Sequence, residues 1–505
     1  MCALKILPVD KIREADAYTI DHEPISSVDL MERAASTCFR WIKDMTGTYQ
    51  KIKVICGTGN NGGDGLAISR MLHHSGFEVE VFVIRFSQDS TEDFEVNFNR
   101  LADLPGLIIT DIYEQDTEIG IEESDLIIDA MLGSGISRPL SGLLARVADQ
   151  INKNGAMVLS IDMPTGLYSD SPVDPRNSII VKADYTLSFQ FPKKAFLIPE
   201  NEVYVGEWVL LDIGLHPEFI DKVDCKDLFI EKEDCINLHR KRAKFAHKGN
   251  FGHALLIAGS TGYFGAAVMA SRACLRSGAG LLTTHVPGDG FLVMQTSVVE
   301  AMISIDPEDV CFSTLPVLDA YNAIGVGPGL GMASETQAAL KLLIQQTSVP
   351  LVLDADALNI ISENKTWLSF LPAGSILTPH PKEFERLTGP TANQFDRLEM
   401  LRAFAIRFKL YVILKGAYSA LATPDGRLYF NSTGNPGMAT GGSGDVLTGI
   451  ILGLLSSGYP ARDACILGMW LHGKAGDIAA EKHGYEAMLA SDLVDNLGKA
   501  FRKLY

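Results

Sequence analysis

The sequence of 505 residues lacks paired cysteines, a long apolar run and an excess of positive charge. Its eight cysteines are scattered and include no CxxC pair, which argues against a zinc ribbon and against a disulfide framework. The best candidate for a membrane span, residues 446–455, is short and interrupted by Thr448, Gly449 and Gly453, so we expect no membrane segment. With 44 basic and 62 acidic residues, the formal charge of −18 excludes a general nucleic-acid binder.

The first ten residues lack the charged segment, apolar core and cleavage site that a secretory signal combines, so we expect a cytoplasmic protein. The composition is 47% apolar and 21% charged, which is typical of a well-packed globular enzyme and not of a disordered chain.

Short β-rich runs alternate with helical patterns along the chain, which indicates parallel βαβ units. The strands expected in the first half are residues 53–56, 79–84, 126–130, 157–161 and 185–189. Those expected in the second half are residues 254–258, 281–285, 323–326, 351–354, 375–378 and 411–414, followed by a hairpin over 420–430 and helices over 445–455 and 461–480. The chain becomes polar between residues 212 and 234, so we predict two α/β domains that meet near residues 220–235.

A glycine-rich segment, residues 54–65, leads from the first expected strand into a helix that we expect to begin near Leu66. Glycines permit positive φ and close approach of a ligand, and the start of a helix offers free N–H groups to an anion. The alternative is an ordinary strand-to-helix turn. The spacing is not GxGxxG, so a Rossmann dinucleotide fingerprint is a weaker match.

Two further strand ends carry carboxylates, Asp129 and Asp162. The carboxyl ends of parallel strands share one edge of a sheet, where ligands bind at the topological switch point. We therefore expect Asn61, Asp129, Asp162 and Thr165 to converge there, although each aspartate alone could be a helix cap or turn former.

In the second half, residues 435–449 hold glycines at positions 441, 442 and 444 just before an apolar helix expected from about Val446. Such glycines can turn N–H groups toward an anion, and the positive end of the helix adds to the attraction. Asp445 could then accept a proton from a hydroxyl that attacks a phosphoryl group. The alternative is a glycine-rich loop in which Asp445 caps the helix.

Other strand exits are less specific. Residues 415–419 could hold an adenine nucleotide, or could form a turn with a solvated lysine. His380 lies between two prolines, which fix its presentation, although a lone histidine is usually structural. Residues 325–331 are glycine-rich but interrupted by Pro328, and no GxxxxGK[ST] sequence supports a Walker-type site.

Residues 60–65, 129–135 and 160–166 resemble the signature blocks of the YjeF N-terminal family, the NAD(P)H-hydrate epimerases. The resemblance implies a Rossmann-like three-layer αβα domain over residues 1–222, with Asp162 as the catalytic residue. It implies a potassium ion held by Asn61, Asp129 and Thr165. The residues implied to surround the hydrated dinucleotide are Asn60, Asn61, Gly62, Gly63, Asp64, Gly133, Ser134, Gly135, Ile136, Ser137, Arg138, Pro139 and Asp162. The family also places a cationic group beside the aspartate, and Arg138 is the nearest basic residue in the loop.

The second half resembles the C-terminal YjeF family, the nucleotide-dependent NAD(P)H-hydrate dehydratases of the ribokinase-like superfamily. The segments that match in order are residues 263–267, 277–281, 327–331, 380–384, 415–417 and 441–449. The resemblance implies a ribokinase-like αβα domain over residues 228–505, with Asp445 as the catalytic residue. The implied hydrate contacts are Ala266, Gly329, His380 and Asp445, and the implied nucleotide contacts are Lys415, Gly416, Ala417, Tyr418, Ser419 and Gly444.

Both resemblances together imply the repair of NADH and NADPH hydrated at C6. The first domain would interconvert the R and S hydrates, with the aspartate exchanging a proton with the departing oxygen. The second would phosphorylate the C6 hydroxyl of the S hydrate from ADP or ATP, with Mg²⁺ on the nucleotide, and phosphate would then leave. ADP is the favoured donor because the fusion resembles prokaryotic members. We expect NADHX, NADPHX and ADP or ATP as ligands, and a homo-oligomer.

Two alternatives stay open. The second half could be a small-molecule kinase of the hydroxymethylpyrimidine or pyridoxal type, because its glycine loop is shared across ribokinase-like enzymes. The first half could then be a non-catalytic binding domain. A stable phosphorylated product would favour the kinase, whereas free phosphate and recovered NADH absorbance would favour repair.

Overall fold

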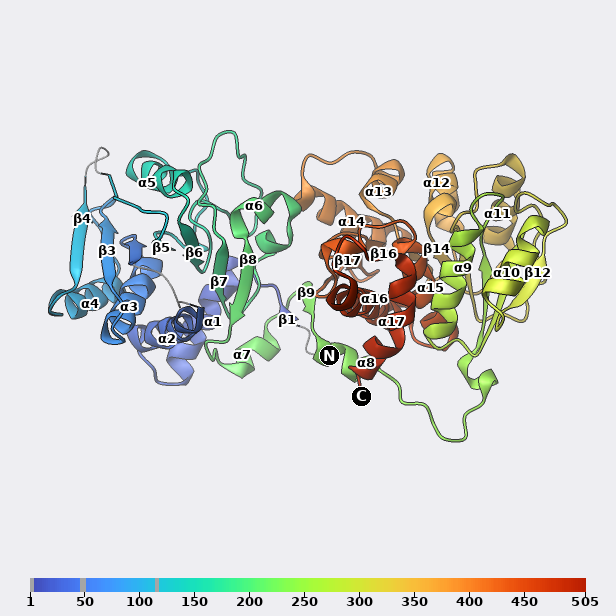
Figure 1. The fold of residues 1–505 in the computed structure, drawn as a ribbon, viewed down its shortest axis with the longest axis horizontal. Helices are drawn as coiled ribbons and strands as arrows, with labels where there is room; N and C mark the ends of the chain where they lie inside the picture. Colours follow the sequence, from blue (N-terminus) through green and yellow to red (C-terminus); the bar gives the residue numbers. More distant parts are fainter. Residues whose placement is uncertain (1–3, 46–50, 114–117) are drawn as a thin grey trace. The chain divides into compact units, whose positions relative to one another are not determined.

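The computed structural model describes residues 4–45, 51–113 and 118–505 and divides the chain into two compact units (Figure 1). The N-terminal unit comprises Lys5–Cys225, and the C-terminal unit comprises Lys226–Tyr505 together with Leu4. Each unit is an α/β sandwich around its own parallel or mainly parallel sheet.

The N-terminal unit contains a seven-stranded sheet in the order β4-β3-β2-β5-β6-β7-β8, in which every neighbouring pair is parallel. The strands are β2 (Ile52–Cys56), β3 (Val79–Ile84), β4 (Ile108–Ile112), β5 (Leu126–Ala130), β6 (Met157–Ile161), β7 (Tyr185–Phe189) and β8 (Glu207–Leu211). The chain runs outward from β2 to β4 on one side and from β5 to β8 on the other. The switch point, where α/β sheets bind ligands, therefore lies between β2 and β5.

Helices cover both faces of this sheet. One face packs against α2 (Ser27–Met45), α3 (Asn60–His74) and α4 (Glu92–Ala102), and the other against α5 (Gly142–Lys153). Successive residues of β2 alternate between the two cores, with Val54 in one and Ile55 in the other. The remaining helices are α1 (Val9–His22), α7 (Pro217–Lys222), which packs against α1, and the short α6 (Glu202–Val205). This confirms the predicted three-layer αβα architecture.

The C-terminal unit contains an eleven-stranded sheet in the order β1-β9-β18-β17-β16-β15-β14-β13-β10-β11-β12. Only the β16–β17 and β17–β18 pairs are antiparallel among the registers that the structure gives, and the β17–β18 pair is the predicted hairpin. The switch point lies between β10 and β13. The strands are β1 (Leu4–Lys5), β9 (Asp227–Ile230), β10 (His253–Ile257), β11 (Leu281–Val286), β12 (Met302–Ile305), β13 (Ala323–Val326), β14 (Leu351–Leu353), β15 (Ile376–Leu377), β16 (Tyr411–Leu414), β17 (Ala420–Ala422) and β18 (Leu428–Asn431).

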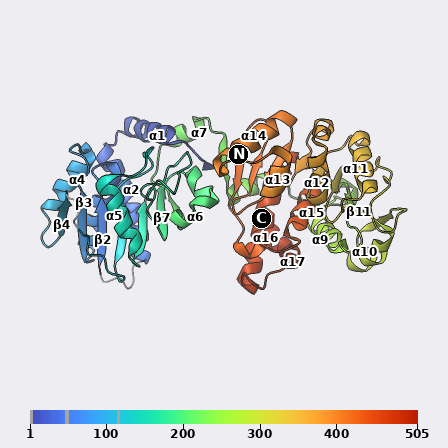
Figure 2. The same cartoon turned by 90° about the horizontal axis from the view of Figure 1, so that it is seen from above.

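On one side of this sheet lie α9 (Phe264–Arg276), α15 (Ser443–Ser456), α16 (Ala461–His483) and α17 (Ala490–Arg502), with α8 (Lys232–Leu238) beside α16. On the other side lie α11 (Ser334–Gln346), α12 (Ala355–Glu363), α13 (Pro381–Thr388) and α14 (Gln394–Phe408), as Figure 2 shows. The short α10 (Phe291–Ser297) precedes β12.

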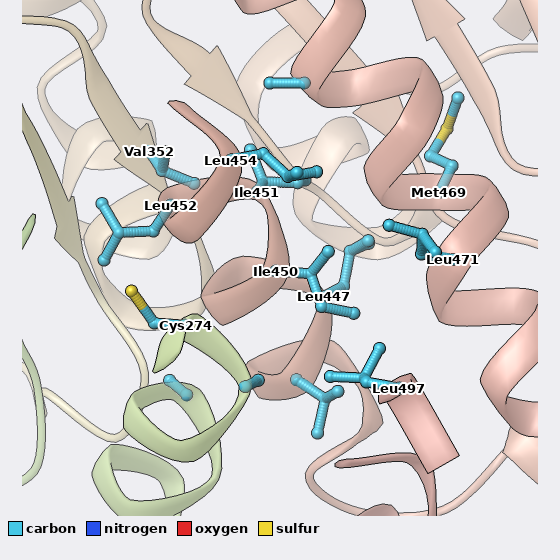
Figure 3. Packing of buried hydrophobic residues seen from close by; sticks show 14 of the residues in the cluster. Cys274, Val352, Leu447, Ile450, Ile451, Leu452, Leu454, Met469, Leu471 and Leu497 are labelled. Carbon is cyan, nitrogen blue, oxygen red and sulfur yellow. The ribbon is translucent and has the colours of Figure 1, made fainter. Parts of the chain in front are cut away.

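Helix α15 is the centre of this core, and it is apolar around most of its circumference (Figure 3). Its side chains Leu447 and Ile450 lie between α9 and α16. Two of its glycines allow α9 to approach closely, because a Cβ at Gly449 or Gly453 would lie 2.2 or 2.5 Å from a carbonyl oxygen of α9. The close contact holds the start of α15 in a fixed place at the edge of the sheet.

Most strand predictions are confirmed, and β3, β5, β6, β7, β13 and β16 have the expected bounds. The missed strands include the edge strands β4 and β12 and the terminal strand β8. Polar residues interrupt the apolar pattern of β4 and β12, whereas β8 was missed although residues 208–211 are a short apolar run. No helix among the described residues is long and apolar enough to cross a membrane.

Candidate functional sites

The glycine-rich segment after β2 is part of helix α3, which begins at Asn60 and not near Leu66. None of its glycines has a positive φ, so that part of our interpretation is wrong. The glycines serve close packing instead. A Cβ at Gly62 would lie 1.9 Å from the carbonyl oxygen of Gly57, and a Cβ at Gly65 would lie 2.6 Å from a side-chain carbon of β5. The first turn of α3 is thereby pressed against the switch point of the sheet.

Asn61, in this first turn, is half-buried, but its amide nitrogen and oxygen are both buried and both lack a partner among the described residues. Such an orphaned amide costs roughly 1–3 kcal/mol, which is unusual unless something else binds it. The amide lies against the loop after β5, because a Cβ at Gly133 would lie 3.4 Å from Cγ of Asn61. The pair of orphaned atoms marks a place for a ligand or an ion.

Asp129 of β5 is fully buried and accepts hydrogen bonds from the backbone N–H of Thr165 (2.9 Å), from its hydroxyl (2.7 Å) and from the hydroxyl of Ser160 (2.9 Å). Burial raises the pKa of Asp129, and the hydrogen bonds oppose the rise. No described cationic side chain pairs with this carboxylate. Thr165 also accepts a hydrogen bond from the backbone of Leu132 (3.1 Å), so the network ties the ends of β5 and β6 together.

Asp162 follows β6 and has a φ of +63°, a left-handed conformation that is uncommon for a residue with a side chain. Its Oδ2 accepts the backbone N–H of Ser134 (2.8 Å), and its Oδ1 lies 3.1 Å from Nζ of Lys193. Burial acts to raise the pKa of Asp162, but the Lys193 charge and the Ser134 hydrogen bond lower it below the ordinary value. Asp162 is therefore an ionised carboxylate held in a strained position at the switch-point edge.

Lys193 is the cationic partner of Asp162, an identity that the sequence left open when it offered Arg138 as the nearest basic residue of the loop. Arg138 is exposed, whereas the side chain of Lys193 is 1% exposed. Lys193 follows β7 by four residues, and Nζ also donates to the hydroxyl of Ser188 (3.1 Å). A lysine just beyond the end of a predicted strand is a signal in the sequence that could have identified this residue.

Two further carboxyl groups act on this pair electrostatically. Burial and the Asp162 charge raise the pKa of Asp64 well above its ordinary value. Burial and the same charge raise the pKa of Asp16, in α1, to about 6, against the opposing charge of Lys193. Asp16 was not among the expected site residues.

The loop of residues 133–139 runs over this edge. Gly133 and Ser134 contact Asp162, because a Cβ at Gly133 would lie 2.9 Å from its Oδ2. The guanidinium of Arg13, in α1, lies against Gly135. Beyond it, Ser137, Arg138 and Pro139 are exposed and Ile136 is half-buried. The structure thus brings Asn61, Asp162, Gly133 and Ser134 together, while Asn60 and residues 137–139 lie at the exposed rim.

In the C-terminal unit, α15 begins at Ser443, three residues before the expected Val446. Its N-cap is Gly442, with a φ of +90°, so Asp445 lies in the first turn and is not the cap. Burial and the Asp354 charge raise the pKa of Asp445 to about 7, against the opposing charge of Lys415. A carboxyl group with this pKa can take up and release a proton near neutral pH.

Lys415 is not a solvated lysine. Its Nζ lies 2.8 Å from Oδ1 of Asp354, whose other oxygen accepts the Thr448 hydroxyl (2.7 Å). Burial acts to lower the pKa of Lys415, but the charges of Asp354 and Glu383 raise it above the ordinary value. A Cβ added at Gly444 would lie 3.3 Å from Nζ of Lys415, so this ammonium group lies beside the first turn of α15. Asp354 and Thr448 were missed by the sequence prediction.

The remaining nucleotide candidates form a turn after β16. Ser419 donates its hydroxyl to the carbonyl of Gly416 (3.0 Å) and accepts the N–H of the same residue (3.2 Å). Gly416 and Ala417 are exposed, and a Cβ at Gly416 would meet nothing within 4 Å. The ring of Tyr418 lies 6.3 Å from that of Phe229. The turn is an open backbone surface close to the buried end of Lys415.

A pocket of about 350 Å³ opens at Asp445. It is lined by Gly265, Ala266, Met269, Gly441, Gly442, Asp445, Leu489, Ala490 and Ser491. The last three residues come from the start of α17, which the sequence prediction did not assign to the site. Leu489 is 59% exposed, so the pocket that holds the Asp445 carboxyl group also has an apolar lining residue open to solvent.

Two other expected hydrate contacts lie nearby. Gly329 has a φ of +61°, and a Cβ there would lie 3.1 Å from that of Ala266, so its backbone closes on the start of α9. His380 is the N-cap of α13, and its Nδ1 accepts the backbone N–H groups of Lys382 (3.1 Å) and Glu383 (3.4 Å). Since 44% of the His380 side chain is exposed, this structural role leaves part of the ring accessible.

Comparisons with known proteins match both units. A family model described as YjeF-related protein N-terminus matches residues 27–195, and one described as NAD(P)H-hydrate dehydratase matches residues 254–499. A bifunctional NAD(P)H-hydrate repair enzyme of Moorella thermoacetica is 36% identical over 95% of this chain and 93% of its own.

Two solved structures resemble the C-terminal part. A ribokinase-like superfamily protein of Enterococcus faecalis is 28% identical, with a TM-score of 0.50 over 55% of this chain and 96% of its own. An ADP/ATP-dependent NAD(P)H-hydrate dehydratase of Bacillus subtilis, co-crystallised with ATP/Mg²⁺, is 31% identical over 55% of this chain and 98% of its own, with a TM-score of 0.48. The first supports the predicted ribokinase-like fold.

Proposed function

Since the chain belongs to the family of bifunctional NAD(P)H-hydrate repair enzymes, we propose that each unit performs one step of that repair. Residues 1–222 form the NAD(P)H-hydrate epimerase domain, and residues 228–505 form the dehydratase domain, which uses ADP or ATP. The observation that supports this most directly is Asp445, a carboxyl group with a pKa of about 7 at the mouth of a pocket and at the start of a buried helix.

In the epimerase domain, the lone pair of the ring nitrogen expels the C6 hydroxyl of the hydrate, and water returns to either face. Because the pKa of Asp162 is lowered, we assign it as the base that takes a proton from the incoming water. The ammonium group of Lys193 lies 3.1 Å away and supplies the proton to the departing oxygen. Asp162 then passes the proton that it took from water to Lys193, so both groups return to their starting states and the reaction is balanced. This reverses our expectation that the aspartate is the first proton donor.

A potassium ion fits the donors beside this pair. Asn61 offers an orphaned amide oxygen, Asp129 a buried carboxylate without a cationic partner among the described residues, and Thr165 a hydroxyl oxygen. Oxygen donors of this kind suit a hard cation. The ion would neutralise the buried charge of Asp129 and hold the first turn of α3 for the ligand. The contacts expected from residues 60–64 and 133–139 belong to the same proposal.

In the dehydratase domain, Asp445 takes the proton of the C6 hydroxyl of the S hydrate while that oxygen attacks the terminal phosphorus of ADP or ATP. The bond between phosphorus and the bridging oxygen breaks, and AMP or ADP leaves. The ring nitrogen then expels phosphate from C6, and the departing phosphate takes a proton from C5, which restores the C5–C6 double bond of NADH or NADPH. Hydroxide is a poor leaving group, so the phosphoryl transfer makes the elimination possible.

The groups around Asp445 can neutralise the negative charge of the phosphoryl group that is transferred. The ammonium group of Lys415 stands beside Gly444, where it neutralises the phosphoryl group, and Asp354 and Thr448 fix its position. The open turn of residues 416–419 accepts the nucleoside, and Mg²⁺ accompanies the nucleotide and neutralises its phosphates. Ala266 and Gly329 border the hydrate, and the accessible edge of His380 contacts it.

The test is to incubate the purified protein with a mixture of R and S hydrates and either ADP or ATP. Repair predicts complete recovery of NADH absorbance with release of free phosphate, and comparison of the two nucleotides gives the preferred donor. Accumulation of a stable phosphorylated product without recovery of NADH would support the small-molecule kinase instead.

Two predictions await other measurements. The seven cysteines that the structure describes are thiols, which favours a reducing compartment, so we propose a cytoplasmic location, which fractionation would test. We also propose a homo-oligomer, which light scattering would test.

A further inference from the structure

Helix α1 contributes two side chains to the edge of the sheet that holds Asp162, although the family model begins at residue 27 and so does not include this helix. Arg13 and Asp16 are three residues apart and therefore lie on the same face of α1. Asp16 acts electrostatically on Asp162 and Lys193. Arg13 lies against Gly135, since a Cβ added at Gly135 would be 2.7 Å from Nη2 of Arg13. The helix therefore faces the candidate epimerase site.

The guanidinium of Arg13 makes no hydrogen bond or ion pair with any residue that the structure describes. Several other arginines of this unit form ion pairs with carboxylates. Arg33 lies 2.8 Å from a carboxylate oxygen of Glu23, and Arg85 lies 2.6 Å from one of Asp111. Arginine has five N–H donors in a planar fork that matches phosphate oxygens. An exposed, unpaired fork at the rim of a dinucleotide site is suited to a phosphate group.

The loop after β5 sets the separation between Arg13 and the reacting centre. Ser134 donates its N–H to Asp162, and the next residue, Gly135, contacts Arg13. One residue of extended chain spans only about 3.3–3.6 Å. If the reduced ring lies at Asp162, Arg13 is thus close to the nicotinamide ribose and its phosphate. The 2′-phosphate of the NADPH hydrate lies on the other nucleoside, beyond the pyrophosphate.

We propose that Arg13 binds the pyrophosphate of the hydrated coenzyme in the epimerase site. This inference rests on the proposed epimerase function. The pyrophosphate is common to both coenzymes, so Arg13 contributes to the binding of NADHX and NADPHX alike. Gly135 permits the contact, because any side chain at this position would occupy the space of the guanidinium.

The experiment compares full-length wild-type protein with Arg13→Gln, Arg13→Lys and a control variant, Arg40→Gln. Arg40 is exposed on α2, and its only hydrogen bond with the described residues goes to the backbone carbonyl of Ser36. Epimerisation of NADHX and of NADPHX is followed separately, and inorganic pyrophosphate is tested as an inhibitor. Arg13→Gln should raise KM for both hydrates by about 10- to 100-fold, which is typical of a lost charged hydrogen bond, and leave kcat within about threefold. Arg13→Lys should recover part of the loss because it keeps the charge but not the fork.

The inhibition constant of pyrophosphate should rise in Arg13→Gln and stay unchanged in Arg40→Gln. Three results would each overturn the inference: an unchanged KM for both hydrates, a rise for NADPHX alone, which would indicate the 2′-phosphate, or a fall in kcat at constant KM. If Arg13→Gln does not fold, the comparison of Arg13→Lys with wild type in the pyrophosphate assay decides. A wild-type protein that does not interconvert the hydrates would instead reject the epimerase function itself.

Discussion

Replacing Asp445 by asparagine should remove dehydration and at the same time stabilise the C-terminal unit. The side chain keeps its size but can no longer accept a proton, so kcat/KM for the S hydrate should fall by about 10²–10⁴, the usual contribution of a general base. The stability effect follows from the pKa of Asp445, which is about 7 in the folded protein against an ordinary value of 3.8.

The sign of the stability effect follows from linkage. A carboxyl group whose pKa is higher in the folded state favours folding when protonated. Its contribution is complete below about pH 3.8 and is lost as the pH rises through about 7. One pKa unit corresponds to about 1.4 kcal/mol, so at pH 8 the ionised group costs at most about 4 kcal/mol. Asparagine avoids this cost, and we expect a gain of at least about 1 kcal/mol, or roughly 2–4 °C in Tm.

The assay is calorimetric unfolding of the full chain at pH 8 and pH 5. The control is Asp319→Asn, because Asp319 is exposed and forms no hydrogen bond or ion pair with any residue that the structure describes. The gain in Asp445→Asn should shrink at pH 5, and the control should change little at either pH. For wild type, kcat/KM of dehydration should rise about tenfold per pH unit below about 7 and then level off. A variant that is less stable at pH 8, or that still dehydrates the S hydrate, would refute the role and the environment assigned to Asp445.

The other predictions concern both units. Lys193→Met should abolish epimerisation and lower the free energy of unfolding by about 3–5 kcal/mol, because the Asp162 carboxylate loses its cationic partner. Adding Asp162→Asn to this variant should recover most of the lost stability, and chemical denaturation would measure both effects. The same Lys193→Met protein should still consume S hydrate while R hydrate accumulates, and equal loss of both activities would contradict independent sites. Exchange of potassium for sodium should weaken epimerase activity, and Asn61→Ala should remove that difference between the cations. Leu489→Ala should raise KM for the S hydrate severalfold with little change in kcat, because it removes the apolar side of the Asp445 pocket; an unchanged KM would place the hydrate elsewhere.

The strands buried on both faces could be predicted because continuous apolar runs distinguish them from helices and loops. Helix starts were less well predicted. The residues from Asn60 to Gly65 looked like a loop because glycine disfavours helices, but the close contacts of Gly62 and Gly65 show that packing against the sheet overrides that preference. Ser443 and Gly444 likewise looked like part of a loop, but they belong to the first turn of α15.

The sequence by itself determined the two α/β units, the alternation of strands and helices and the positions of Asp162 and Asp445, because these depend on local patterns and on residues next to strand ends. Only the tertiary structure decided that Lys193 pairs with Asp162, that Asp354 holds Lys415, and that α1 and the start of α17 border the two sites. These neighbours come from distant parts of the chain. Which of them meet depends on strand order and on how each helix packs, and no short segment of sequence specifies either.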